Sequence, residues 1–344
     1  MELEPLLLGA LLVISFLVAF AIGSNDEAMA PAVGANVFTV RTAVLIGGFI
    51  TIVGAVSLGS NVSEKVGSDL VGGKTVSTEM VFSVLISIAI WLIIASSTKG
   101  LPISTTQCIV GSIIGVAGFA PFVGYDGWGM EAIDWFVVLE VFAGWIISPI
   151  IGFLIAAAVF AVVRRLQKRA QGFTALERQE QIAAYGLAVF LIITSLSRGG
   201  NDVANAIAPV IVLPEFLGTT QLGPFVFSAT LIPLLVGGCG MALGLIVIGR
   251  KVIKTLATEV VSLSPSSALS ATISVAVILL LGTLIGLPLS GTHLLVAALI
   301  AVGWVADTPV QMQQVKEILI SWIVTVPVSA ILGVAVLWMI APIF

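Results

Sequence analysis

Long apolar runs fill most of this chain and limit the folds that it can adopt. A helix of about 20 apolar residues crosses the hydrocarbon core of a bilayer and satisfies its backbone groups internally. Hydrophobic residues make up 59% of the 344 residues and charged residues only 9%, whereas a soluble domain is about one quarter charged. We therefore predict an all-α polytopic membrane protein. The runs that we expect to cross are residues 5–22, 42–59, 78–98, 102–119, 134–163, 183–198, 222–248, 266–284, 287–304 and 317–340.

The positions of the basic residues predict how these helices are oriented. The most polar stretch begins at Arg164 and continues to Arg178. Cytoplasmic loops of membrane proteins carry an excess of Lys and Arg. With residues 164–181 in the cytoplasm, eleven of the 14 Lys and Arg residues fall inside and both termini fall outside. We expect a multi-pass protein of the cell inner (plasma) membrane, surrounded by the lipid bilayer.

Three landmarks recur in the same order and at nearly constant spacing in the second half of the chain. They are Asn25-Asp26 with Asn201-Asp202, residues 100–107 with residues 286–293, and Trp145 with Trp322. Five crossings in each half would invert the second half relative to the first. We predict inverted repeats at 1–163 and 182–344, joined by a cytoplasmic basic linker at 164–181. Inverted repeats with interrupted helices are typical of secondary transporters, whose substrate sites lie where the interruptions meet.

Each Asn-Asp pair follows an apolar run in a segment too short and too broken to cross alone. We expect residues 24–38 and 199–213 to form re-entrant or half helices, so that each repeat has about five crossings plus one broken helix, or 10–12 transmembrane segments in all. An unpaired carboxylate at membrane depth is costly, so Asp26 and Asp202 indicate a functional site. Their oxygens favour a hard cation such as sodium. The alternative is a helix cap, for which Asn and Asp are well suited.

The second repeated motif, Gly-Leu-Pro followed by Ser and Thr, predicts the start of a helix. Proline suits the first turn, and the free N–H groups and positive dipole end of a helix attract anions. The hydroxyl groups could add hydrogen bonds from Ser104, Thr105, Thr106, Ser290 and Thr292. The alternative is that these residues bond their own helix or allow close helix packing. A multivalent oxyanion beside Asp26 and Asp202 would be repelled unless cations lay between them, which predicts cation–anion symport.

These four motifs resemble the signatures of the inorganic phosphate transporter family, the sodium- or proton-coupled phosphate permeases, over essentially the whole chain. The resemblance implies inverted repeats, a transport and a scaffold region, and a homodimer. It implies phosphate-binding positions at Ser104, Thr105, Thr106, Ser290, Gly291, Thr292, Asn25 and Asn201. It implies sodium-binding positions at Asp26, Asp202, Asn25 and Asn201.

Five positions depart from the pattern of that family. Glu27 and Met29 replace a Val and an Asn of the first Asn-Asp motif, and Gln107 replaces a His. Gly291 replaces a Thr, and Arg198 stands where some members have His. These changes bear directly on the ligand set and on the coupling ion.

The function that we expect is sodium-coupled symport of inorganic phosphate. A proton-coupled phosphate permease and a related sulfate permease are the alternatives, and a channel or a receptor-like membrane protein is a third class. The chain has no nucleotide-binding loop, metal-ligand cluster or nucleophile–His pair, so we expect no enzyme. We expect no cofactor, with sodium ions as co-substrate, and no nucleic acid partner. Glu79, Glu140, Arg198 and His293 are open candidates for ion coupling, interface or packing roles.

Overall fold

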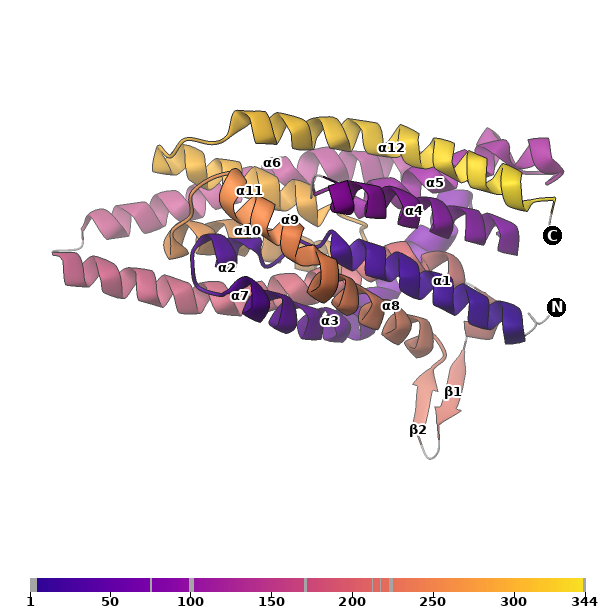
Figure 1. The fold of residues 1–344 in the computed structure, drawn as a ribbon, viewed down its shortest axis with the longest axis horizontal. Helices are drawn as coiled ribbons and strands as arrows, with labels where there is room; N and C mark the ends of the chain where they lie inside the picture. Colours follow the sequence, from indigo (N-terminus) through magenta and orange to yellow (C-terminus); the bar gives the residue numbers. More distant parts are fainter. Residues whose placement is uncertain are drawn as a thin grey trace.

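The computed structural model describes residues 5–74, 76–98, 102–169, 172–211, 213–216, 218–222 and 225–342. Long helices lying side by side form nearly all of this part of the chain (Figure 1). The helices are α1 (Pro5–Ser24), α2 (Ala30–Gly34), α3 (Val40–Ser68), α4 (Thr78–Thr98), α5 (Thr105–Phe119), α6 (Trp135–Lys168), α7 (Phe173–Ile211), α8 (Leu231–Gly244), α9 (Arg250–Glu259), α10 (Pro265–Leu284), α11 (Gly291–Ala306) and α12 (Met312–Ile340). A π-helical turn, Leu245–Gly249, joins α8 to α9, and short 3-10 turns lie at Asp69–Val71, Ala120–Val123, Met130–Ala132 and Pro214–Phe216.

The apolar runs of the sequence form the membrane-spanning part of the fold. In the described residues, nine helices are long and apolar enough to cross a bilayer, and Gly291–Ala306 is a shorter apolar helix. The expected all-α polytopic fold is thereby confirmed. Figure 1 shows α1 beginning and α12 ending at one end of the bundle, with the last turns of α6 and the first turns of α7 at the other end.

A small hairpin interrupts the expected helix at 222–248. Strand β1 (Thr219–Leu222) pairs with β2 (Phe225–Ser228) in antiparallel fashion, with Thr219 opposite Ser228. Thr, Val and Phe favour the extended backbone, and the following helix α8 starts only at Leu231. The hairpin projects beyond the helices in Figure 1.

The two Asn-Asp motifs have different backbones, which corrects one expectation. Helix α1 ends at Ser24, and residues 25–29 run without helix to the short α2. By contrast, α7 continues without a break from Phe173 through Asn201 and Pro209 to Ile211. The prediction of a half helix at 199–213 is therefore wrong. The Gly residues that suggested a break serve another purpose, which is close helix packing.

Glycines let several pairs of helices touch backbone to backbone. A β-carbon on Gly54 of α3 would lie 2.0 Å from Leu196 O of α7, and one on Gly199 would lie 2.3 Å from Thr51 O of α3. The same arrangement joins α1 to α8, where a β-carbon on Gly23 would lie 1.9 Å from Met241 O. Small residues that allow such approach are a common device of helix association in membranes.

The buried apolar residues fall into two clusters, and the chain passes from one to the other just after α1 and within α7. Ile22 and Val203 belong to the first cluster, together with much of α4 and α5. Met29 and Leu191 belong to the second, together with much of α10 and α11. Residues 23–28 and 192–202 thus lie at the boundary between the two cores, and both stretches contain buried polar and charged side chains.

Candidate functional site

Two helices begin inside the protein, next to each other. Ser104 precedes α5 and accepts a hydrogen bond from Gln107 N at 3.3 Å, and Ser290 precedes α11 and accepts one from His293 N at 3.3 Å. Both serines are at most 2% exposed. Each serine caps its helix, as the Gly-Leu-Pro motifs predict. Residues 99–101, which include the start of the first motif, lie outside the described residues.

A reciprocal pair of contacts joins the two helix starts. Thr106 Oγ1 donates to Leu289 O at 3.3 Å, and Thr292 Oγ1 lies 3.5 Å from Ile103 O. Thr106 and Thr292 occupy the same position of the repeated motif, and so do Ile103 and Leu289. The two motifs thus exchange equivalent contacts, which is the relation expected of two repeats about a pseudo-two-fold axis.

The two asparagines of the Asn-Asp motifs fasten the segments that precede these helices. Asn25 Nδ2 donates to Ser96 Oγ at 3.1 Å, and Asn25 Oδ1 accepts from Ile103 N at 3.0 Å. Asn201 Nδ2 donates to Thr283 Oγ1 at 3.2 Å and to Leu287 O at 2.9 Å. Each side chain therefore connects the Asn-Asp motif of its repeat to the Gly-Leu-Pro motif of the same repeat.

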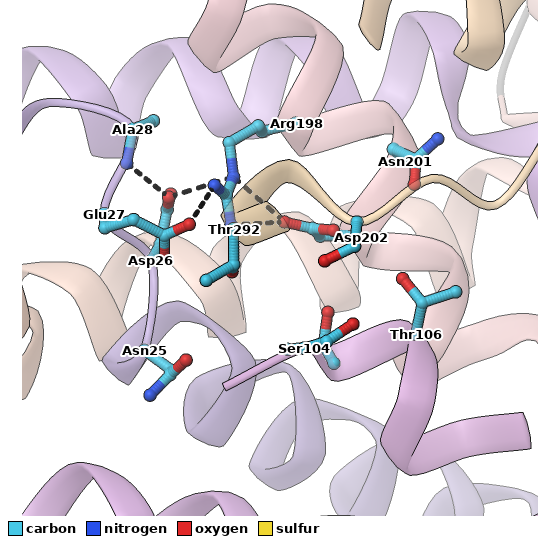
Figure 2. Close-up of polar contacts among 12 residues, drawn as sticks. Asn25, Asp26, Glu27, Ala28, Ser104, Thr106, Arg198, Asn201, Asp202 and Thr292 are labelled. Carbon is cyan, nitrogen blue, oxygen red and sulfur yellow. Dashed lines mark hydrogen bonds and ion pairs between the residues drawn. The ribbon is translucent and has the colours of Figure 1, made fainter. Parts of the chain in front are cut away.

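Arg198 lies between the two acidic motifs, as Figure 2 shows. Its guanidinium contacts Asp26 Oδ1 at 3.2 Å, Glu27 Oε1 at 2.5 Å and Asp202 Oδ2 at 3.1 Å. All four residues are at most 3% exposed. Asp26 Oδ1 also accepts from Ala28 N at 2.9 Å, which fixes the turn after α1.

The count of basic residues left Lys65, Lys74 and Arg198 outside, and the structure corrects this for Arg198, which is buried. The residue lies within α7, one helical turn before Asp202, and pairs with it across that turn. Positions i and i+4 share a helix face, so the pair follows from an unbroken helix. Sequence reasoning missed the pair because it expected the helix to break at Gly199. In the sequence, Glu27 was noted only as a departure from the family pattern. The structure brings it into contact with the same guanidinium as Asp26 and Asp202.

The cluster carries more negative than positive charge. Three carboxylates face one guanidinium, so its formal charge is −2 (three negative charges and one positive). Among the described residues, no hydrogen-bond donor reaches Glu27 Oε2, Asn201 Oδ1 or Asn205 Oδ1, although all three atoms are buried. Asn205 Nδ2 donates to Thr105 Oγ1 at 3.0 Å, so this amide lies beside α5. Buried oxygens without donors are costly unless a cation or a protonated ligand completes them.

The carboxylates point at Arg198 rather than at one shared metal position. In the part of the chain that the structure describes, no group of three or more His, Cys, Asp or Glu residues is arranged to hold a metal ion. In this structure the guanidinium of Arg198 lies between Asp26 and Asp202.

The remaining candidates for ion coupling have ordinary surroundings. Glu140 forms an ion pair with Lys65 at 2.8 Å, and the Glu140 side chain is 40% exposed. Glu79 lies in the first turn of α4 and is half-buried. The ring of His293 packs on Trp322 with 3.8 Å between centroids, and His293 Nδ1 lies 3.4 Å from Trp145 O. The contacts of Glu140 and His293 match the interface and packing roles considered for them, although no partner among the described residues reaches the buried His293 Nε2.

Comparison with known proteins places this fold and site in a family. The model of a phosphate transporter family matches residues 22–333 of the chain, which include both Asn-Asp motifs and both helix starts. The chain belongs to the phosphate transporter family.

Relatives of this transporter match it over nearly the whole length of this chain. A protein of Pyrococcus abyssi named as a phosphate permease is 29% identical, over 99% of this chain and 100% of the relative. A protein of the same name in Pyrococcus horikoshii is 30% identical, over 94% of this chain and 95% of the relative. The chloroplastic inorganic phosphate transporter 2-1 of Arabidopsis thaliana is 28% identical, over 96% of this chain and 71% of the relative.

A solved structure shares the fold of this transporter. The sodium-dependent phosphate transporter superposes with a TM-score of 0.82 at 28% identity, covering 98% of this chain and 100% of the other. The chain is thus a multi-pass membrane transporter of the phosphate family, with the helical architecture that its apolar runs predict.

Proposed function

We propose that this protein is a secondary active transporter that carries inorganic phosphate across the plasma membrane in symport with sodium ions, and that it catalyses no chemical reaction. The observation that carries the proposal is the excess of buried carboxylates over guanidinium beside two helix N-termini. Membership of the phosphate transporter family supports phosphate as the substrate. The negative charge of the cluster supports coupling to sodium ions. We also propose two inverted repeats, at 1–163 and 182–344, and a homodimer in the bilayer.

The anion half of the proposed site is the pair of helix starts. An N-terminus offers unpaired N–H groups and the positive end of the helix dipole, both of which favour a phosphate. Ser104 and Ser290 each accept a cap bond and keep a hydroxyl proton that can be donated to a phosphate oxygen. We propose Ser104, Thr105, Thr106, Ser290, Gly291, Thr292, Asn25 and Asn201 as phosphate-binding positions.

The cation half is formed by the acidic cluster and its neighbouring amide oxygens. A dianion entering beside a cluster of charge −2 is repelled at low effective dielectric. Sodium ions prefer oxygen ligands, and the buried oxygens of Asn201 and Asn205 have no donor among the described residues. We propose Asp26, Asp202, Asn25 and Asn201 as sodium-binding positions, with sodium making phosphate binding favourable.

A proton-coupled phosphate permease is the second candidate, and Glu27 favours it. This carboxylate is fully buried, and no donor among the described residues reaches its Oε2. A buried carboxyl in such surroundings is a reasonable carrier of a proton. A sulfate permease on the same scaffold is distinguished by its substrate, since sulfate brings no proton near neutral pH and phosphate does.

Uptake into proteoliposomes tests the proposal directly. Labelled phosphate uptake is measured with a sodium gradient alone, with a proton gradient alone and with neither. We expect accumulation with the sodium gradient only, and excess sulfate should not compete. Full accumulation in sodium-free buffer under a proton gradient would reject sodium coupling and retain phosphate transport. Sulfate uptake without phosphate uptake would reject phosphate as the substrate.

Replacing either threonine at the helix starts should weaken phosphate binding. Losing one hydrogen bond to a charged group costs about 1.5–3 kcal/mol, or roughly tenfold to a hundredfold in affinity. Each hydroxyl donates its one proton to a carbonyl here and would turn to a phosphate oxygen on binding. Thr106→Ala and Thr292→Ala each remove this hydroxyl, whereas Thr106→Ser and Thr292→Ser are matched variants that keep it. We expect weaker phosphate binding, measured by calorimetry, in the Ala variants only. Equal affinity in all four variants would leave these residues a packing role.

Cysteine labelling tests the proposed orientation, in which residues 164–181 face the cytoplasm. Arg178 and Asp126 are both exposed, near opposite ends of the helices. In a background without Cys108 and Cys239, we expect an impermeant maleimide added to sealed right-side-out vesicles to label Asp126→Cys and not Arg178→Cys. The reverse labelling pattern would invert the orientation.

A further inference from the structure

Arg198 occupies the space between the acidic groups of the two Asn-Asp motifs. Its Nε lies 3.2 Å from Asp26 Oδ1, and its Nη2 lies 3.1 Å from Asp202 Oδ2, so one group bridges both motifs. Its third contact, Nη1 to Glu27 Oε1 at 2.5 Å, is the shortest of the three ion pairs. Figure 2 shows the guanidinium with carboxylates on both sides. The protein itself thus provides one positive charge among the three carboxylates.

The guanidinium also touches the start of α11. A β-carbon on Gly291 would lie 2.8 Å from Arg198 Nη1 and 2.9 Å from its Cζ, so only glycine leaves the guanidinium its place. Gly291 is the first residue of α11. The N-terminus of a helix is its positive end and repels a cation. The arginine therefore depends on its three carboxylates to remain in this position.

Three of the five departures from the family pattern meet at this contact. Arg198 supplies the charge, Glu27 supplies the extra carboxylate that holds it, and Gly291 supplies the space. A buried arginine without a carboxylate, or a larger residue at 291, would make the arrangement unfavourable. The three residues therefore form one packed unit.

We propose that Arg198 is a resident cation of the transport site and takes the place of one cation that would otherwise travel with the anion. Glu27 also determines the net charge of the cluster, because its carboxylate restores the negative charge that Arg198 neutralises. This inference rests on the proposed function of cation-coupled phosphate symport. By this inference, Arg198 and Glu27 determine how many positive charges are transported with each phosphate.

Charge arithmetic gives the expected effect of each variant. The wild-type cluster has a formal charge of −2 from Asp26, Glu27, Asp202 and Arg198. Arg198→Gln makes it −3 and Glu27→Gln makes it −1, whereas the double variant returns to −2 by the same count. If transported cations neutralise the cluster, Arg198→Gln should add one positive charge per phosphate and Glu27→Gln should remove one. The double variant should match the wild type.

The experiment measures net charge moved per phosphate in proteoliposomes, from reversal potentials at imposed sodium and phosphate gradients. This ratio counts sodium ions and protons alike, so it tests the exchange of a resident for a travelling cation of either kind. Glu140→Gln is the matched control, because Glu140 pairs with Lys65 away from the cluster. Its ratio should equal that of the wild type.

The charge ratios of Glu27→Gln and of the double variant decide whether Arg198 is a resident cation. A ratio one lower in Glu27→Gln and unchanged in the double variant supports the resident cation. A ratio unchanged in Glu27→Gln, with phosphate uptake intact, overturns it. Arg198→Gln leaves three carboxylates without a counter-charge, so if it fails to fold, the Glu27→Gln and double variants still decide. Absence of phosphate uptake by the wild type would instead reject the proposed function itself.

Discussion

Asp26→Asn and Asp202→Asn should each abolish sodium-driven phosphate uptake. The substitution keeps the shape of the side chain and removes one negative charge from the cluster around Arg198. Removing one partner of a buried ion pair costs about 3–5 kcal/mol. We expect sodium affinity to fall by at least a hundredfold, measured by calorimetry on purified protein. Any remaining phosphate binding should lose its dependence on sodium.

Thermodynamic linkage provides a second test of this prediction, and Glu140→Gln provides a control. If sodium tightens phosphate binding by some factor, phosphate must tighten sodium binding by the same factor. Both factors should approach one in the Asn variants. Glu140→Gln makes the same chemical change in a partly exposed ion pair, where the expected cost is about 0–1 kcal/mol. Unchanged sodium-driven uptake in both Asp variants would show that these carboxylates hold Arg198 and have no part in coupling.

Adding one methyl group at the contact between α3 and α7 should strongly destabilise the protein. A β-carbon on Gly54 would lie 2.0 Å from the backbone oxygen of Leu196, and one on Gly199 would lie 2.3 Å from that of Thr51. Backbone atoms of two long helices cannot move aside separately, so the helices must separate. Overpacking costs about 1–3 kcal/mol or more at one site. We expect Gly54→Ala and Gly199→Ala each to lower the unfolding temperature of the solubilised protein.

Gly9→Ala is the matched control for this packing prediction. Gly9 lies in α1, and a β-carbon there would meet no atom of the described structure within 4 Å. Alanine also favours a helix by about 1 kcal/mol over glycine, so Gly9→Ala should leave the unfolding temperature unchanged or raise it. An unchanged unfolding temperature in Gly54→Ala as well would mean that α3 and α7 can separate at little cost.

The long helices could be predicted because hydrophobicity is a property of each segment alone. The hairpin at Thr219–Ser228 was missed because its residues adjoin an apolar run and only strand pairing distinguishes the two. The continuity of α7 was missed for a related reason. In the sequence alone, Gly199 and Gly200 indicate a helix break. In the structure they allow α7 to pack closely against the neighbouring helix α3.

Within the site, the repeated residues were predictable and their partners were not. Repetition identified Asp26 and Asp202, and Gly-Leu-Pro identified the helix starts at Thr105 and Gly291. Nothing along the chain links Arg198 to Glu27, which is 171 residues away. Their contact depends on how α7 packs against the end of α1, and a single sequence does not contain that information.

The unlike backbones of the two Asn-Asp motifs give the two halves different mechanical properties. Helix α7 has 39 residues, or about 58 Å at 1.5 Å per residue, and crosses both apolar clusters as one stiff rod. Arg198 and Asp202 must therefore move together. Asp26 and Glu27 belong to residues 25–29, which lie outside any α-helix and are held by turn bonds such as Asp26 N to Gly23 O and Ala28 N to Asp26 Oδ1. With fewer backbone bonds than the helix α7, this segment is where we expect a hinge. We expect the site to open by a swing of this hinge away from the rod, so that the ion pairs from Arg198 to Asp26 and Glu27 break first and the pair to Asp202 survives.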